Sequence, residues 1–130
     1  MYTVTFLPKF ASEFGNFPHD QQDKILNFVG LFETYGLNDF SRYEGKIAPS
    51  WSNLDITDPD YLYCINNSLW HYHIGIPEYQ QVHTKYRTSV WILHFQWPDR
   101  GTHINLVDIY THEDVHGNFY IPPQAYLNKR

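Results

Sequence analysis

His71 and His73 are the two residues whose type and spacing most directly suggest chemistry. They lie in the stretch Leu69–Gly75, where large apolar or aromatic residues alternate with them. This alternation is typical of a β-strand, so both imidazoles are expected on one face of a sheet, with apolar side chains on the other. Two imidazoles on a rigid face are suited to proton transfer, contact with an anion, metal binding, or exposure to solvent.

Cleavage of RNA through its 2′-hydroxyl is one reaction that the chain is equipped for. The reaction needs a base for the 2′ proton, a cation for the phosphorane, and an acid for the 5′ leaving oxygen. Histidine serves as base or acid near neutral pH, and Arg or Lys can hold the phosphate. The candidate residues are His71, His73, His83, His94, His112, His116, Lys85, Tyr86, Arg87, Tyr110 and Tyr120. Of these, Lys85, Tyr86 and Arg87 stand together in a stretch that can either grip an RNA backbone and stack a base or form a surface loop.

A metal site is the second possibility for the histidine pair. His71 and His73, followed by Glu78 and a later histidine, resemble the ligand set of cupin barrels, and such ligands suit Zn, Fe, Ni or Mn. The glycine-rich second cupin motif is missing, and a helical first third is unlike a jelly roll. The sequence also has no Gly-x-Ser-x-Gly elbow and no phosphate-binding loop, and Cys64 reads as a core residue of an apolar strand.

The expected elements place these residues on an antiparallel sheet. A strand is expected over residues 2–6, a helix over Pro8–Phe17, and a second helix from about Pro18 to its end at Gly36. The second helix carries an apolar stripe at helical spacing, made of Ile25, Phe28, Val29 and Phe32. After a long connection over residues 37–60, strands are expected over Tyr61–Ile65, Leu69–Gly75, Thr88–Trp97 and His103–Thr111, with a last helical turn within Pro122–Leu127.

This order predicts a single α+β domain over residues 1–130. The N-terminal strand and two helices would pack on a four- to five-stranded antiparallel sheet, with the apolar helix stripe on one face. The other face, bearing His71, His73 and His94, would form the site.

Composition narrows the classes of function. The 130-residue chain has a formal charge of −5, and the whole acidic excess lies in residues 1–60, which argues against strong nonspecific binding to nucleic acid. A single cysteine excludes an internal disulfide and a zinc site with several cysteines, and it fits a reducing cytosol. No signal peptide is recognisable and no stretch approaches about 20 apolar residues, so a cytoplasmic protein without a membrane span is expected.

The sequence resembles a known family in three places. Leu69–Gly75 resembles the Leu-Trp-Arg-x-Arg-Val-Gly strand of RelE/ParE-type toxins from bacterial toxin–antitoxin pairs, with histidine at both arginine positions. The phenylalanine-rich N-terminus resembles that family's opening strand and helical hairpin, and Tyr110-Thr111-His112 resembles the end of its last strand. Together with Tyr86–Ser89, these stretches are most similar to the YafO branch, whose members are ribosome-dependent mRNA interferases.

The resemblance implies a RelE-like, microbial-RNase-like fold and roles for individual residues. His73 would contact the scissile phosphate with His71 beside it, Arg87 would be a second phosphate contact, and His112 would be the general acid or base. Tyr110 or Tyr120 would lie nearby. The implied partners are a cognate antitoxin and mRNA in the ribosomal A site, and no cofactor is implied. A non-catalytic binding or immunity protein with an acidic surface is the alternative, beside the cupin-like metal protein.

Overall fold

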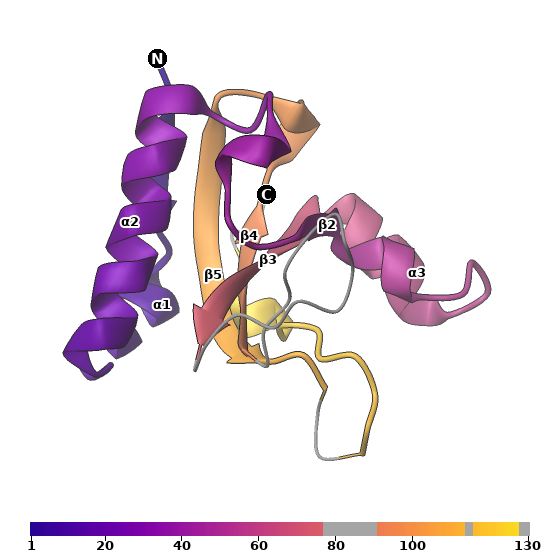
Figure 1. Cartoon of the computed structure of the whole chain (residues 1–130). Coiled ribbons are helices and arrows are strands. Elements are labelled where there is room, and N and C mark those ends of the chain that lie inside the picture. The colour runs from indigo at the N-terminus through magenta and orange to yellow at the C-terminus, as the bar shows by residue number, and fades with distance from the viewer. Residues whose placement is uncertain (77–90, 114–115, 128–130) are drawn as a thin grey trace.

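The computed structural model describes residues 1–76, 91–113 and 116–127. Within these residues the fold is α+β, as predicted, with helices on both faces of a five-stranded mixed sheet (Figure 1). The sheet has the strand order β1-β5-β4-β3-β2. In chain order the elements are β1 (Thr3–Phe6), α1 (Pro8–Phe14), α2 (His19–Tyr35), β2 (Ile47–Pro49), α3 (Pro59–Asn66), β3 (Leu69–Ile76), β4 (Trp91–Gln96) and β5 (His103–Thr111), with short 3-10 turns at Phe40–Arg42, Ser50–Asn53, Pro98–Arg100 and Gln124–Tyr126.

The two N-terminal helices begin and end for local reasons. Pro8 occupies the first turn of α1, where a missing N–H costs nothing, and α1 ends at Phe14 rather than at Phe17 as predicted. α2 ends at Tyr35 and is followed by Gly36, the predicted terminating residue, whose φ of 66° is a conformation that favours glycine.

The larger hydrophobic core lies between these helices and one face of the sheet. Phe28 is 1 % exposed and stacks on Tyr72 of β3 with ring centroids 4.8 Å apart. Ile25 and Phe32 are buried in the same core, and Val29 packs against it while partly exposed. The predicted helix stripe is therefore confirmed as the contact between the helical layer and the sheet.

Residues 61–65 are helical, so the predicted strand and the hairpin that joined it to β3 are wrong. They belong to α3, where the Asp58 side chain accepts a hydrogen bond from the Asp60 N–H at 2.9 Å and Pro59 fills the first turn. Cys64 is buried as predicted, but on this helix. It lies in a second, smaller core on the opposite side of the sheet, with Leu7, Leu69, Val107 and Leu127.

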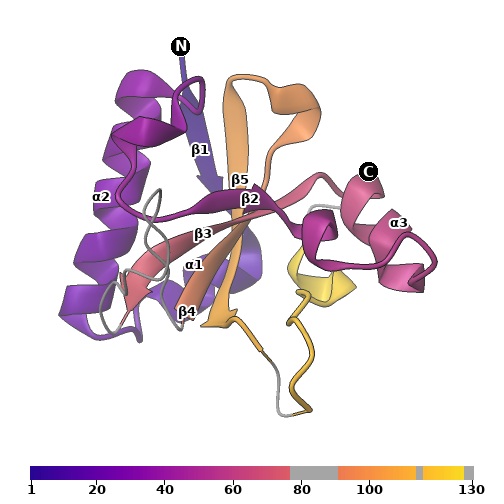
Figure 2. The ribbon, with the colours of Figure 1, turned by 45° about the vertical axis from the view of Figure 1, so that its right-hand side comes forward.

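The sheet is mixed rather than antiparallel. β1 runs parallel to β5, with Thr3 opposite His103, and the two strands lie side by side in Figure 2. The His103 imidazole is within hydrogen-bond distance of the hydroxyls of Thr3 (2.6 Å) and Thr5 (3.0 Å), so it fastens β1 to β5. The short edge strand β2, which lies in the expected connection, pairs antiparallel with β3.

The described helices include none with the length and apolar character needed to cross a membrane.

Candidate functional site

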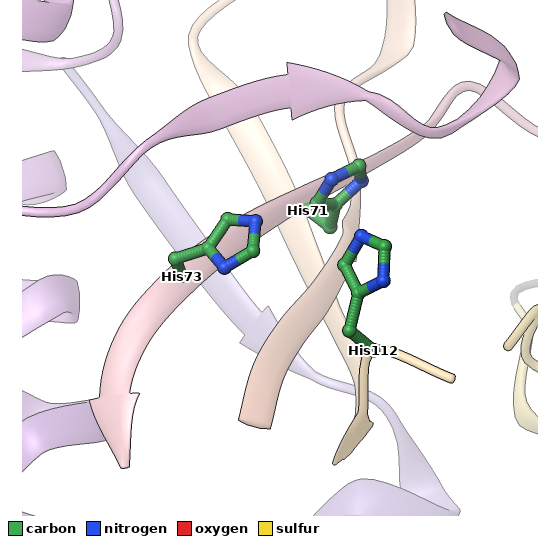
Figure 3. Close-up of side chains that lie close together, drawn as sticks. All are labelled: His71, His73 and His112. Atoms are coloured by element: carbon green, nitrogen blue, oxygen red, sulfur yellow. The ribbon is translucent and has the colours of Figure 1, made fainter. Parts of the chain in front are cut away.

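Three histidines from two separate parts of the chain converge on one face of the sheet. His71 and His73 project from β3, and His112 directly follows the last residue of β5. One ring nitrogen from each residue lies within 4.8 Å of the others. Figure 3 shows the three imidazoles gathered around a common space. The sequence predicted the strand pair and named His112, and the fold brings the three together.

Ring distances define the shape of this histidine cluster (His71, His73 and His112). The centroids of His71 and His73 are 5.8 Å apart, and those of His71 and His112 are 6.1 Å apart. His73 and His112 are 5.6 Å apart and nearly parallel, with an interplanar angle of 24°. All three rings can therefore contact one small group at the same time.

The face predicted to form the site carries the cluster, and it is largely buried. His71 is 1 % exposed and His73 is 5 % exposed, while His112 is partly exposed. The chain turns back after β5, where the Tyr120 N–H donates to the His112 carbonyl at 3.0 Å. This places the Phe119 ring 5.2 Å from His71 and 5.0 Å from His112. Periodicity identified the face, but it carries no information on which later segment covers it.

Two residues from the region expected to be a loop hold the cluster in place. The Ser50 hydroxyl lies 3.1 Å from Nδ1 of His71, and both residues are buried. The backbone N–H of His73 donates to the backbone carbonyl of Lys46 at 2.9 Å. Neither Ser50 nor Lys46 was identified from the sequence, because nothing in their spacing ties them to the histidine strand.

Burial favours the neutral imidazole at two members of the cluster, His71 and His112. The pKa of His71 is well below its usual value, first because of burial and then because of the neighbouring histidines and Lys46. Burial also lowers the pKa of His112, where the nearby Glu113 acts in the opposite direction. Neutral imidazoles have a free lone pair, which is the form that accepts a proton or binds a metal ion.

His94 lies beside the cluster and has an unusual environment. It pairs with His71 across β3 and β4, and its ring centroid is 6.2 Å from that of His71. Burial lowers the pKa of His94 to about 3. Among the described residues, neither of its ring nitrogens has a hydrogen-bond partner. Buried polar groups are nearly always hydrogen-bonded, so two buried ring nitrogens without a partner are an exception that requires an explanation.

Tyr110 and Tyr120 form a separate unit next to the cluster. Their rings stack with centroids 4.1 Å apart, and the Tyr120 hydroxyl donates to Oδ2 of Asp108 at 2.6 Å. Burial raises the pKa of Asp108 to about 6, and it also raises the pKa of the Tyr120 phenol. Both tyrosines line an open groove of about 760 Å³.

The same groove is acidic on its other side. Asp55, Asp58 and Asp60 line it, and the first two cap local backbone N–H groups. Three carboxylates repel an RNA phosphate, so the groove is a poor place for the scissile bond. The histidine cluster is the better candidate for chemistry.

The remaining predicted residues fall outside the described part of the chain. Lys85, Tyr86 and Arg87, and Glu78 of the cupin-like alternative, lie within residues 77–90. The described elements themselves form a helix-covered mixed sheet, which is not the jelly roll of a cupin. Comparison of the chain with protein-family models, with curated proteins and with solved structures finds no match.

Proposed function

We propose that this protein is an endoribonuclease toxin of the RelE/ParE type, most similar to the YafO branch, which cuts mRNA through the 2′-hydroxyl. The observation that supports this most strongly is the convergence of His71, His73 and His112, within 4.8 Å of one another, at the end of the last strand. RNA cleavage of this kind needs a base and an acid on either side of one phosphate, and imidazoles supply both.

The proposed reaction assigns one step to each group. A neutral imidazole takes the 2′ proton as the 2′ oxygen attacks phosphorus. The bond from phosphorus to the 5′ oxygen breaks, and a protonated imidazole gives that oxygen its proton. The products are a 2′,3′-cyclic phosphate and a 5′-hydroxyl. His112 is the partly exposed member and so is the base most open to RNA, with His73 facing it as the acid.

His71 has a positioning role in this scheme. It is fully buried and its Nδ1 lies beside the Ser50 hydroxyl, which fixes the ring against its neighbours. A ring held in this way does not reach the phosphate, but it keeps His73 and His112 at the distance that the reaction requires.

The cation for the phosphorane comes from Lys46 and Arg87. The charge of Lys46 lowers the pKa of both His71 and His112, so it lies within electrostatic reach of the cluster. A positive charge held at the site stabilises the charge that develops on the phosphorane oxygens. Arg87 keeps the role of a second phosphate contact that the resemblance implies.

The proposed substrate is mRNA in the ribosomal A site. A chain with a formal charge of −5 attracts RNA weakly, and a ribosome that already holds the mRNA supplies the positioning instead. A cognate antitoxin is the second proposed partner. It would block the histidine cluster and contact the acidic first half of the chain through basic residues of its own.

The test is cleavage of mRNA in a translation reaction with purified ribosomes, followed by mapping of the cut ends. His73→Ala and His112→Ala should each lower the cleavage rate by about 10²–10⁴-fold, because each removes a proton-transfer group. Lys46→Gln should lower it by about 10²-fold through the loss of a stabilising charge. The reactions contain Mg²⁺ and a chelator selective for transition metals.

His19→Ala is the matched control, since His19 is an exposed histidine at the start of α2. It should cut as fast as the parent. Equal rates for the parent, His73→Ala and His112→Ala would refute the catalytic assignment. A parent protein that cuts no mRNA, with or without ribosomes, would support the non-catalytic binding or immunity protein instead.

A further inference from the structure

The histidine cluster also has the composition of a metal site. Metal binding there does not require that the protein acts on RNA. We propose that His71, His73 and His112 bind one divalent transition-metal ion of the Zn²⁺ type. Three imidazole nitrogens within 4.8 Å of one another, and no carboxylate among them, suit Zn²⁺, Co²⁺, Ni²⁺ or Cu²⁺ rather than Mg²⁺ or Ca²⁺.

The distances are close to those that a tetrahedral ion requires. Zn–N bonds of about 2.0–2.1 Å place the nitrogens about 3.4 Å from each other, so the rings must approach by on the order of 1 Å. Three protein ligands leave a fourth position for water or a substrate, which is the pattern of catalytic rather than structural zinc sites.

Ser50 provides the support that metal-binding histidines usually have. Such a histidine donates its second ring N–H to a nearby acceptor, which fixes both the ring and the tautomer. Nδ1 of His71 lies 3.1 Å from the buried Ser50 hydroxyl. When Nδ1 donates to that oxygen, the Nε2 lone pair is left for the ion.

His94 provides a second, independent observation that points to a ligand. Its two buried ring nitrogens have no hydrogen-bond partner among the described residues, and it lies next to His71. An ion with a water in its fourth position would bring a hydrogen-bonding group to this buried region. The unsatisfied polar ring and the converging lone pairs are then explained by one ligand.

The charges around the cluster are compatible with a bound cation. The positive charge of Lys46 disfavours a bound cation, whereas the negative charge of Glu113, which lies near His112, favours one.

The experiment is titration of the chelator-treated protein with Zn²⁺ by calorimetry and with Co²⁺ by visible absorption. We expect one ion per chain and the absorption of a four-coordinate Co²⁺ site. His73→Ala and His112→Ala should weaken Zn²⁺ binding by at least about 10²-fold, and Ser50→Ala by about 10–100-fold, because removing the partner of a ligand has that effect. His19→Ala should bind like the parent.

Zn²⁺ binding to the three histidines can also be measured on the parent protein, so that the result does not depend on whether a variant folds. NMR of the imidazole nitrogens should show that Zn²⁺ shifts the ring signals of His71, His73 and His112 and leaves those of His19 and His103 in place. Absence of Zn²⁺ binding, shifts confined to other histidines, or equal affinity in folded His112→Ala and the parent would overturn the proposal. An imidazole bound to a metal cannot accept a 2′ proton, so metal binding and the imidazole acid–base cleavage proposed above exclude one another. Each can be measured without the other.

Discussion

Asp108 is the buried carboxyl group whose ionisation should be visible in the stability of the protein. Burial raises its pKa from 3.8 to about 6 in the folded state, although the Tyr120 hydroxyl and the Ile109 N–H donate to it. The unfolded chain therefore loses this proton at lower pH than the folded chain does. The resulting destabilisation is absent below about pH 4, grows between pH 4 and 6, and is complete above about pH 7.

Asp108→Asn should remove this dependence. The stability of Asp108→Asn relative to the parent should rise by about 3 kcal/mol between pH 4 and 7, measured by urea unfolding at several pH values. Asp55→Asn is the control, because hydrogen bonds from Thr57 lower the pKa of this exposed carboxyl group, and its difference from the parent should change weakly in the opposite direction. A pH-independent difference for Asp108→Asn would contradict the prediction.

Individual site residues were predictable from the sequence only where a pattern marked them. Alternation on β3 singled out His71 and His73, and the end of a strand singled out His112. Ser50 lies 21 residues before His71, which it contacts through its side chain. Lys46 lies 27 residues before His73, which it contacts through its backbone carbonyl. No periodicity connects such residues, because their proximity is produced by the path of the chain between elements.

At the scale of elements, the two glycines of α2 should respond to alanine with opposite signs. Gly30 lies within the helix and a Cβ there meets nothing within 4 Å, so Gly30→Ala should stabilise the protein by about 0.5–1 kcal/mol. Gly36 has φ 66° and ψ −157°, and a Cβ there would overlap the Tyr2 ring. Gly36→Ala should destabilise by about 1–3 kcal/mol from backbone strain alone.

Thermal and urea unfolding of both variants measure this difference. Loss of stability in Gly30→Ala would show that a Cβ at position 30 is not accommodated in the helix. A Gly36→Ala variant as stable as the parent would show that the end of α2 is not fixed at Gly36. The parent provides the common reference, since both substitutions add the same single methyl group.

Residues 61–65 were predicted to form a strand but belong to the helix α3, because hydrophobic periodicity alone does not distinguish the two here. Tyr61–Ile65 is apolar at nearly every position, so neither the period of a strand nor that of a helix stands out. The decisive signal was Asp58 followed by Pro59, a cap and first turn that the structure uses to begin α3. The three-residue strand β2 is too short to show any period.

At the scale of the whole molecule, Phe28 joins the helical layer to the sheet. It contacts Tyr72 and Phe95 on two neighbouring strands, with centroid distances of 4.8 Å and 5.7 Å. Phe28→Ala should cost about 3–5 kcal/mol, as expected for a large cavity in a packed core. Leu26→Ala, at an exposed position on the same helix, should change the stability by less than about 0.5 kcal/mol. Urea denaturation tests this pair, and similar losses for both variants would place the core elsewhere.

The general architecture followed from the sequence, while the pairing of distant strands did not. The apolar stripes of α2 and β3 identified the two layers and the core. The alternation in residues 3–6 predicted a strand without naming its partner, and the partner lies about a hundred residues away. Register between distant strands depends on the closure of the whole fold, which local periodicity does not encode.

The parallel pairing of β1 with β5 has a consequence for the synthesis of the protein. β5 is translated about a hundred residues after β1, so at about 5–20 residues per second β1 waits on the order of 5–20 s for its partner. Until β5 has been made, the nascent chain has neither the complete sheet nor the histidine cluster, since His112 follows β5. If the protein cuts mRNA on ribosomes as proposed, this delay protects the ribosome that makes it, because the histidine cluster forms only after His112 has been translated.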